Sequence, residues 1–213
     1  MDFSVYFVVD PQCCGSRAVE AVVEAAVAGG ASMVQLRDKS GDLSEVERRA
    51  RAVMRVLAGT GLPFLVNDYA DVAAVVGAQG VHLGQGDMAP ERARAIVGDA
   101  AIVGWTAFLP EHFSALAPDV VDYAGTGPFY PTLTKPGKSV LGADGFSDLV
   151  AMSPVPVVGI GGIVPENAGA VIRAGAAGVA MMRGISEASD PAQAARNYLL
   201  AVEAARRDVR LVG

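Results

Sequence analysis

The sequence is poor in the residues that build disulfide frameworks and histidine metal sites. Its 213 residues include two cysteines, Cys13 and Cys14, and two histidines, His82 and His112. Cysteines adjacent in sequence match neither a structural disulfide pattern nor a metal or redox spacing. With two histidines in the whole chain, a histidine-based zinc site is disfavoured. We therefore interpret all four residues as structural.

Charge is also scarce, and long apolar runs are absent. Charged residues make up 19% of the chain, the formal net charge is -6 and the sequence pI is about 4.9. An acidic balance argues against nucleic acid or an anionic membrane surface as the main partner. No apolar run approaches a membrane span, and the N-terminus lacks a basic segment followed by an apolar one. We expect a cytoplasmic protein, and the sequence leaves a homo-oligomer open.

What the sequence does contain is a repeated strand-helix pattern. Hydrophobic residues make up 52% of the chain, which is ample for a sizeable core. Short apolar runs predict strands at 3–9, 32–36, 63–66, 80–83, 101–103, 120–124, 155–160 and 178–182. Helical spacing and capping signals predict helices at 17–28, 43–57, 69–76, 90–97, 110–116, 146–152, 165–174 and from 191 onward.

Eight such units predict an α/β fold, a single-domain (β/α)8 TIM barrel over residues 1–213. An open doubly wound sheet is the alternative, although it rarely contains so many units.

The segment 125–138 combines glycines, prolines, threonines and lysines. Its three prolines restrict the backbone, so we expect a stiff loop. A stiff loop that presents Thr132, Thr134 and Lys135 suits an anionic ligand, because hydroxyls and an ammonium group bind phosphoryl oxygens. The alternative is a surface turn that the lysines keep soluble.

In a barrel, the carboxyl ends of the strands and the loops after them form the face that carries the active site. Polar residues and glycines gather at these predicted strand ends. They are Gln35, Arg37, Lys39, Asn67, Asp68, Gln85, Asp87, Thr106, Thr132, Thr134, Lys135, Gly161, Gly162 and Arg183.

Two carboxylates, Asp68 and Asp87, end adjacent predicted strands, so both can face one small space. Mg²⁺ is commonly held by one or two carboxylates together with waters and substrate phosphates, which makes this pair a candidate metal site. The alternative is helix N-capping, since each residue precedes a predicted helix. The cations Arg37, Lys39 and Lys135 converge on the same rim, with a solvated rim as their alternative.

Glycines and backbone amides predict a second anion site. Gly161 and Gly162 follow the seventh predicted strand, and Met182 and Arg183 end the eighth, which is the usual phosphate-binding position in such barrels. Four aromatic residues near the rim can stack on an aromatic ligand or pack under a loop. They are Tyr69, Trp105, Phe129 and Tyr130.

Five motifs, taken together and in order, resemble the thiamine phosphate synthase family over nearly the whole chain. They are Val34–Lys39, Leu65–Asp68, Val81–Asp87, Gly127–Lys135 and Gly159–Ile163. The resemblance implies a (β/α)8 transferase of thiamine biosynthesis that joins a 4-amino-2-methylpyrimidine methyl diphosphate to a thiazole phosphate. Pyrophosphate is released with the help of Mg²⁺, through a dissociative substitution.

The resemblance also implies roles for individual residues. Gln35, Arg37, Lys39, Asn67 and Lys135 would hold the diphosphate, and Asp68 and Asp87 the magnesium. Thr132, Thr134, Gly162 and the backbone at Met182 and Arg183 would hold the thiazole phosphate. We expect Arg37, Lys135 and Thr106 to act in catalysis, and Thr106 also to bind substrate.

The chain departs from the family pattern at two strand ends. Thr106 stands where the family usually has serine, and the threonine keeps the hydroxyl group. Arg183 stands where a small residue is common. Two alternatives remain: the related thiazole tautomerase, and a sensor that binds thiamine precursors. The tautomerase uses a histidine in the loop where this chain has Gly127 and Pro128, and a sensor has no use for the diphosphate cations.

Overall fold

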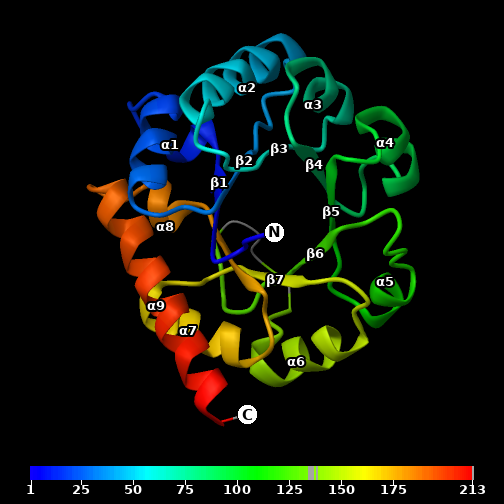
Figure 1. Ribbon diagram of the computed structural model, residues 1–213, viewed down its shortest axis with the longest axis vertical. Coiled ribbons are helices and arrows are strands. Elements are labelled where there is room, and N and C mark those ends of the chain that lie inside the picture. The colour runs from blue at the N-terminus through cyan, green and yellow to red at the C-terminus, as the bar shows by residue number, and fades with distance from the viewer. Residues whose placement is uncertain (134–136, 138, 213) are drawn as a thin grey trace.

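Eight parallel strands close into one barrel, and the helices surround it (Figure 1). The computed structural model describes residues 1–133, 137 and 139–212. The strands are β1 (Val5–Val9), β2 (Met33–Leu36), β3 (Phe64–Asn67), β4 (Gly80–Leu83), β5 (Ile102–Thr106), β6 (Tyr123–Thr126), β7 (Val157–Ile160) and β8 (Gly178–Met181). Because β1 pairs with both β2 and β8, the predicted barrel is confirmed and the open sheet is wrong.

A helix follows each strand, and two short helical turns are added. The short turns are η1 (Pro11–Cys13) and α8 (Arg183–Ser186). The longer helices are α1 (Val19–Ala28), α2 (Leu43–Leu57), α3 (Ala70–Val76), α4 (Pro90–Val97), α5 (Pro110–Ser114), α6 (Gly142–Met152), α7 (Pro165–Arg173) and α9 (Pro191–Val212). Among the described helices, none combines the length and the apolar character needed to cross a bilayer.

The alternation of side chains along each strand divides the core in two. On β1, Tyr6 and Val8 point into the barrel, whereas Phe7 packs with the helices outside it. Strands buried on both faces must be apolar throughout, which explains the short continuous apolar runs of the sequence. Phe3 lies against the Tyr123 ring, with the ring centroids 5.0 Å apart, and so fills the amino end of the barrel.

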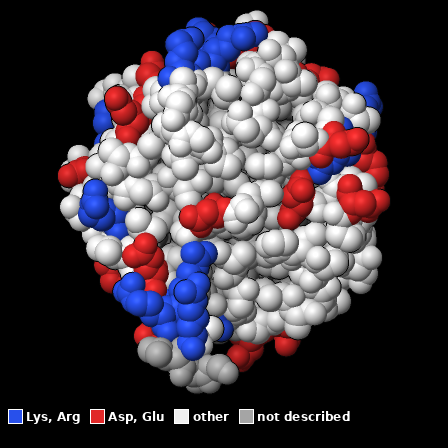
Figure 2. Space-filling model, viewed as in Figure 1, with Lys and Arg blue, Asp and Glu red and all other residues white. Residues whose placement is uncertain are grey.

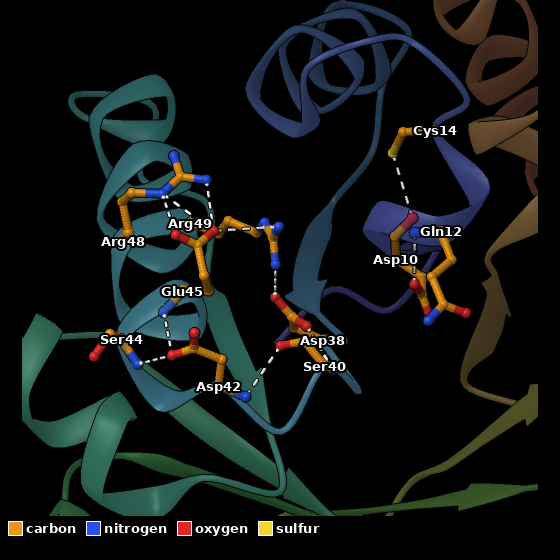
Figure 3. A network of polar contacts seen from close by, with 10 residues as sticks. All are labelled: Asp10, Gln12, Cys14, Asp38, Ser40, Asp42, Ser44, Glu45, Arg48 and Arg49. Atoms are coloured by element: carbon orange, nitrogen blue, oxygen red, sulfur yellow. Dashed lines mark hydrogen bonds and ion pairs between the residues drawn. The ribbon is translucent and has the colours of Figure 1, made fainter.

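The outer helices carry most of the surface charge. Asp42 caps α2, as expected, by accepting hydrogen bonds from the backbone of Ser44 (3.0 Å) and Glu45 (3.2 Å) (Figure 3). Figure 2 shows basic side chains over α2 and over the C-terminal half of α9, and a largely uncharged surface between them. The long helix α9 packs along α7 and α1.

Two strands extend further toward the predicted site than the sequence pattern indicated. The strand predicted at 120–124 lies at Tyr123–Thr126, because the amides of Val120 and Val121 bond to the Ala117 carbonyl in a turn. β5 likewise continues to Thr106, which pairs with Gly125. The loop that the sequence predicted at 125–138 therefore begins after Thr126.

Candidate functional site

A cavity of about 510 Å³ opens at the carboxyl ends of the strands. The predicted site residues that line it are Gln35, Arg37, Lys39, Asn67, Asp68, Asp87, Thr106, Thr132, Gly161, Gly162, Met182 and Arg183. Gln85, which also follows a predicted strand, does not line this cavity, and its side-chain amide donates to the Thr106 carbonyl. Two further predicted residues, Thr134 and Lys135, lie outside the described residues. The closure of the barrel thus brings residues from seven strand ends to one space.

Two rim cations are held in place by carboxylates. Arg37 forms an ion pair with Asp10 at the end of β1, and Lys39 forms one with Asp68. The Asp10 side chain is 4% exposed, while Arg37 and Lys39 are 26% and 43% exposed. An anchored cation that still faces solvent can meet an incoming anion without losing much side-chain entropy. This geometry favours anion binding over a solvated rim.

The backbone presents the two acidic residues to the same cavity. Asp68 adopts φ = 67°, which is uncommon outside glycine, and its amide donates to the His82 carbonyl (2.8 Å). The Gly84 amide donates to the Asp87 carboxylate (2.7 Å). Neither aspartate caps a helix, since the N-cap residues of α3 and α4 are Tyr69 and Ala89. The capping alternative is therefore wrong for both.

The two carboxyl groups titrate as a pair because they contact each other. Burial raises the pKa of Asp68, and the neighbouring Asp87 carboxylate raises it further, against the Lys39 ammonium. Burial also acts to raise the pKa of Asp87, but the hydrogen bonds from Asp68 and the Gly84 amide outweigh it and lower that pKa. A proton is therefore retained more readily on Asp68.

This pair fits a divalent cation. Crowded carboxylates repel each other, and a bound cation would relieve that repulsion in place of a shared proton. Among the residues described, no cluster of three or more histidine, cysteine, aspartate or glutamate side chains could hold a metal ion. Mg²⁺ does not need one, since it takes one or two carboxylates and fills its remaining positions with water and phosphate oxygens.

The glycine pair after β7 holds the loop after β6 against the cavity. Gly161 and Gly162 have φ of 98° and 65°, and a Cβ atom at Gly162 would lie 2.4 Å from the Pro131 carbonyl oxygen. The Phe129 amide donates to the Ile160 carbonyl (3.0 Å), which continues the contact. This close approach brings Thr132 to the cavity wall. The short helix α8 begins at Arg183, which also lines the cavity, and the Arg183 guanidinium lies 3.5 Å from the Glu187 carboxylate.

The sequence pattern did not identify the polar floor of the cavity. Tyr6, His82 and Tyr123 line it, although histidine within a strand suggested a structural role. The rim aromatics instead pack elsewhere: Trp105 lies near His112, and Phe129 packs between Tyr130 and Phe146. A tyrosine inside an apolar strand run was the available signal, because a buried phenol needs a hydrogen-bond partner.

The chain matches the family model described as "Thiamine monophosphate synthase" over residues 5–185. It is 42% identical over 207 residues to a thiamine-phosphate synthase of Azorhizobium caulinodans, covering 97% of this chain and 98% of that one. A thiamine-phosphate synthase of Xanthobacter autotrophicus is 44% identical over 206 residues, with 96% and 98% covered.

A solved structure of similar shape extends the comparison. Thiamine phosphate pyrophosphorylase from Pyrococcus furiosus superposes with a TM-score of 0.85 and 29% sequence identity, covering 95% of this chain and 96% of that one. The likeness in sequence and in fold therefore spans the whole barrel.

Proposed function

This chain belongs to the thiamine monophosphate synthase family, a family of transferases. We propose that it joins two phosphorylated substrates in this cavity to form thiamine phosphate. The substrates are 4-amino-2-methyl-5-pyrimidinylmethyl diphosphate and 4-methyl-5-(2-phosphooxyethyl)thiazole. The products are thiamine phosphate and pyrophosphate. The two alternative hypotheses are a thiazole tautomerase and a sensor that binds thiamine precursors.

One observation carries the proposal: cations, an acidic pair and a hydroxyl-bearing loop line a single cavity. Arg37 and Lys39 reach it from the β2 end, Asp68 and Asp87 from the β3 and β4 ends, and Thr132 from the loop after β6. The phosphate of one substrate and the diphosphate of the other need binding groups at separate places in the same cavity, and these residues provide them. The cavity of about 510 Å³ is also within the range that encloses small ligands.

The diphosphate is assigned to the side of the cavity formed by β2, β3 and β4. Gln35, Arg37, Lys39 and Asn67 would donate to its oxygens, which stabilises the charge that develops on the leaving group. Lys135, which lies outside the described residues, is assigned to the diphosphate from the sequence. Asp68 and Asp87 would hold Mg²⁺, and the bound ion would supply further positive charge for the diphosphate. The ion pair with Asp10 orients the Arg37 guanidinium for this contact.

The thiazole phosphate is assigned to the opposite side. Thr132, Gly161 and Gly162 would approach it from the loops after β6 and β7, and the backbone at Met182 and Arg183 from the start of α8. Thr134, which lies outside the described residues, is assigned to the same phosphate from the sequence. Arg183 lines the cavity, and its charge would add to the positive potential here. Two anion subsites on opposite walls leave the reacting carbon and nitrogen in the space between them.

The chemistry is a dissociative substitution. The bond between the methylene carbon and the diphosphate oxygen breaks first, and its electron pair leaves with the diphosphate. The amino-pyrimidine ring stabilises the methylene cation, and the lone pair of the thiazole nitrogen then forms the new carbon–nitrogen bond. The protein supplies orientation and charge stabilisation and needs no strong nucleophile or base.

A reconstitution with purified protein tests the proposal. The two substrates and Mg²⁺ should yield thiamine phosphate and pyrophosphate in equal amounts, measured by chromatography and a coupled pyrophosphate assay. Binding of the thiazole phosphate without turnover would favour the sensor instead. Conversion of a thiazole carboxylate phosphate in the absence of the pyrimidine would favour the tautomerase.

Cytoplasmic location and assembly into a homo-oligomer complete the proposal. Cell fractionation with an antibody to the chain tests the first. Size-exclusion chromatography with light scattering tests the second.

A further inference from the structure

Five side chains form a continuous series of hydrogen bonds across the barrel interior. Gln35 Nε2 on β2 donates to the Tyr6 hydroxyl on β1, and the Tyr6 and Tyr123 hydroxyl oxygens lie 2.7 Å apart. Tyr123 Oη lies 2.8 Å from His82 Nδ1, and His82 Nε2 lies 3.0 Å from Thr106 Oγ1. The series joins two predicted substrate-binding residues, Gln35 and Thr106, through three residues that have no assigned role.

The direction of each hydrogen bond follows from the first. The Gln35 amide nitrogen can only donate, so the Tyr6 oxygen accepts. The Tyr6 proton then goes to the Tyr123 oxygen, since no other acceptor for it exists among the described residues. Tyr123 in turn donates to His82 Nδ1, which places the imidazole hydrogen on Nε2 and directs it to Thr106 Oγ1. With the Gln35 amide nitrogen toward Tyr6, the reverse direction would leave the Tyr6 hydroxyl buried without an acceptor.

The barrel is shaped to accommodate these rings. A Cβ atom at Gly104 would lie 2.2 Å from Cζ of Tyr123, and one at Gly125 would lie 3.0 Å from Cε1 of His82. Tyr6 and Tyr123 are 2% and 0% exposed, and burial raises the pKa of both phenols, so both keep the protons that they donate. Glycine on β5 and β6 is thus matched to the aromatic groups that cross the barrel.

We infer that Tyr6, Tyr123 and His82 are positioning residues that orient the Thr106 hydroxyl. Because Thr106 Oγ1 accepts from His82, its own proton is directed into the cavity, toward an acceptor atom of the pyrimidine diphosphate. Gln35, at the other end of the series, faces the same ligand. This inference rests on the proposed function for the identity of the ligand, but the histidine tautomer is a property of the protein alone.

The tautomer can be measured without substrate. The chain has two histidines, so a two-dimensional ¹⁵N–¹H spectrum of the imidazole groups contains two patterns, and His112→Asn assigns them. Neutral His82 is expected as the Nε2–H form in the wild type, with loss of this preference in Tyr123→Phe. A wild-type His82 in the Nδ1–H form would overturn the inference.

Kinetics test whether the series acts through Thr106. Tyr123→Phe should lower kcat about 10-fold, as expected for loss of an outer hydrogen-bond partner, with an unchanged KM for the thiazole phosphate. In a Thr106→Val background the same change should have no further effect, because the hydroxyl to be oriented is gone. An equal loss in both backgrounds would mean that Tyr123 contributes through packing alone. Wild-type protein without turnover would instead count against the proposed function.

Two further variants of His82 test which of the two imidazole nitrogens matters for activity. His82→Gln keeps an amide donor near the place of Nε2, whereas His82→Asn keeps a polar group near the place of Nδ1. The first should retain more activity than the second, and the opposite order would contradict the inference. Ser32→Ala is the matched control, because it removes a hydroxyl hydrogen bond to Val5 at the amino end of the barrel. It should leave kcat unchanged.

Discussion

At the scale of single residues, Asp68 stands out by its backbone. It is the one non-glycine residue at positive φ in the described part of the chain, and its carboxylate contacts both Lys39 and Asp87. Sparsely populated backbone conformations persist at positions where the surrounding structure enforces them, and such positions are often functional. Asp68, Asp87 and the exposed Lys39 therefore form one cluster on the cavity wall.

Asp87→Asn removes one of the two proposed metal-binding carboxylates while keeping the size of the side chain. We expect kcat to fall on the order of 10²-fold and the Mg²⁺ concentration for half-maximal activity to rise, because charge on the departing diphosphate is less well neutralised. Asp148→Asn, an exposed change on α6, is the control. An unchanged Mg²⁺ dependence would remove Asp87 from the metal site.

Lys135→Ala tests a role in leaving-group binding that is predicted from the sequence alone. If its ammonium stabilises the leaving group, kcat should drop about 10²-fold or more, by analogy with the loss of one preorganised donor. Steady-state rates with saturating thiazole phosphate measure the effect. Lys138→Ala makes the same change three residues along the loop, and equal losses in the two variants would indicate a general charge effect.

Gly104→Ala tests how closely β5 and the Tyr123 ring are matched. The new methyl group would overlap the ring, so we expect a loss of about 1–3 kcal/mol in the free energy of unfolding. Gly86→Ala is the control, because a Cβ atom there meets nothing within 4 Å. Urea unfolding followed by circular dichroism gives both values, and similar values for the two variants would show that the ring can move aside.

At the scale of elements, the connection from β2 to α2 is fixed by a network of acidic residues (Figure 3). Asp38 forms an ion pair with Arg49 of α2 and accepts from the Ser40 amide (2.9 Å). The Asp42 amide bonds to the Ser40 hydroxyl (3.3 Å), which leads into the helix cap. Because Arg37 and Lys39 flank Asp38, this network also sets where the two rim cations lie.

Asp38→Asn should lower stability at neutral pH by about 1–3 kcal/mol, since Asp38 is 3% exposed and bonded to a charged partner. Burial opposes ionisation, but the Ser40 amide and Arg49 together lower the pKa of Asp38. The contribution is therefore complete above the unfolded-state pKa of about 3.9 and is lost as the pH falls through the lower folded-state value. Urea unfolding of both proteins from pH 7 to pH 3 measures it.

The expected difference between wild type and Asp38→Asn is constant from pH 7 to about pH 5 and narrows as the solution becomes acidic. A difference that stays the same at pH 3 would mean that the Asp38 charge is not what stabilises the loop. Asp148→Asn again provides the control, with an exposed carboxylate on α6.

At the scale of the whole molecule, the barrel concentrates positive charge locally in a protein whose net charge is -6. The arginines of α2 and α9 lie on the outside (Figure 2), whereas Arg37 and Lys39 line the cavity. An anionic substrate is therefore attracted by a small region and not by the surface as a whole. This arrangement predicts that ligand binding depends on Mg²⁺ and on the rim cations together.

Pyrophosphate with Mg²⁺ should stabilise the folded protein, because both bind the closed barrel and not the unfolded chain. At 100 times the dissociation constant the gain is about 2.7 kcal/mol, which a thermal-unfolding scan detects as a raised Tm. Either component alone should give a smaller shift. The Asp87→Asn variant should lose the dependence on Mg²⁺, and an equal shift in that variant would contradict the assignment.

The sequence predicted much of the fold and of the site, for identifiable reasons. Apolar runs of three to seven residues located all eight strands, and strand ends located the described site residues that line the cavity. The errors came from pairing: Gly125 and Thr126 belong to β6 because β5 and β7 supply hydrogen-bond partners on either side. Local residue preferences carry no information about such partners.

By itself, the sequence determined the number and order of the strands and the residue types that follow each one, because apolar period and turn chemistry are local properties. Only the tertiary structure decided which polar groups meet. The contact between Asp68 and Asp87, the ion pair of Arg37 with Asp10, and the series from Gln35 to Thr106 all join residues of different strands. Closure of the barrel creates these contacts, since it sets the register between strands that are distant in the chain.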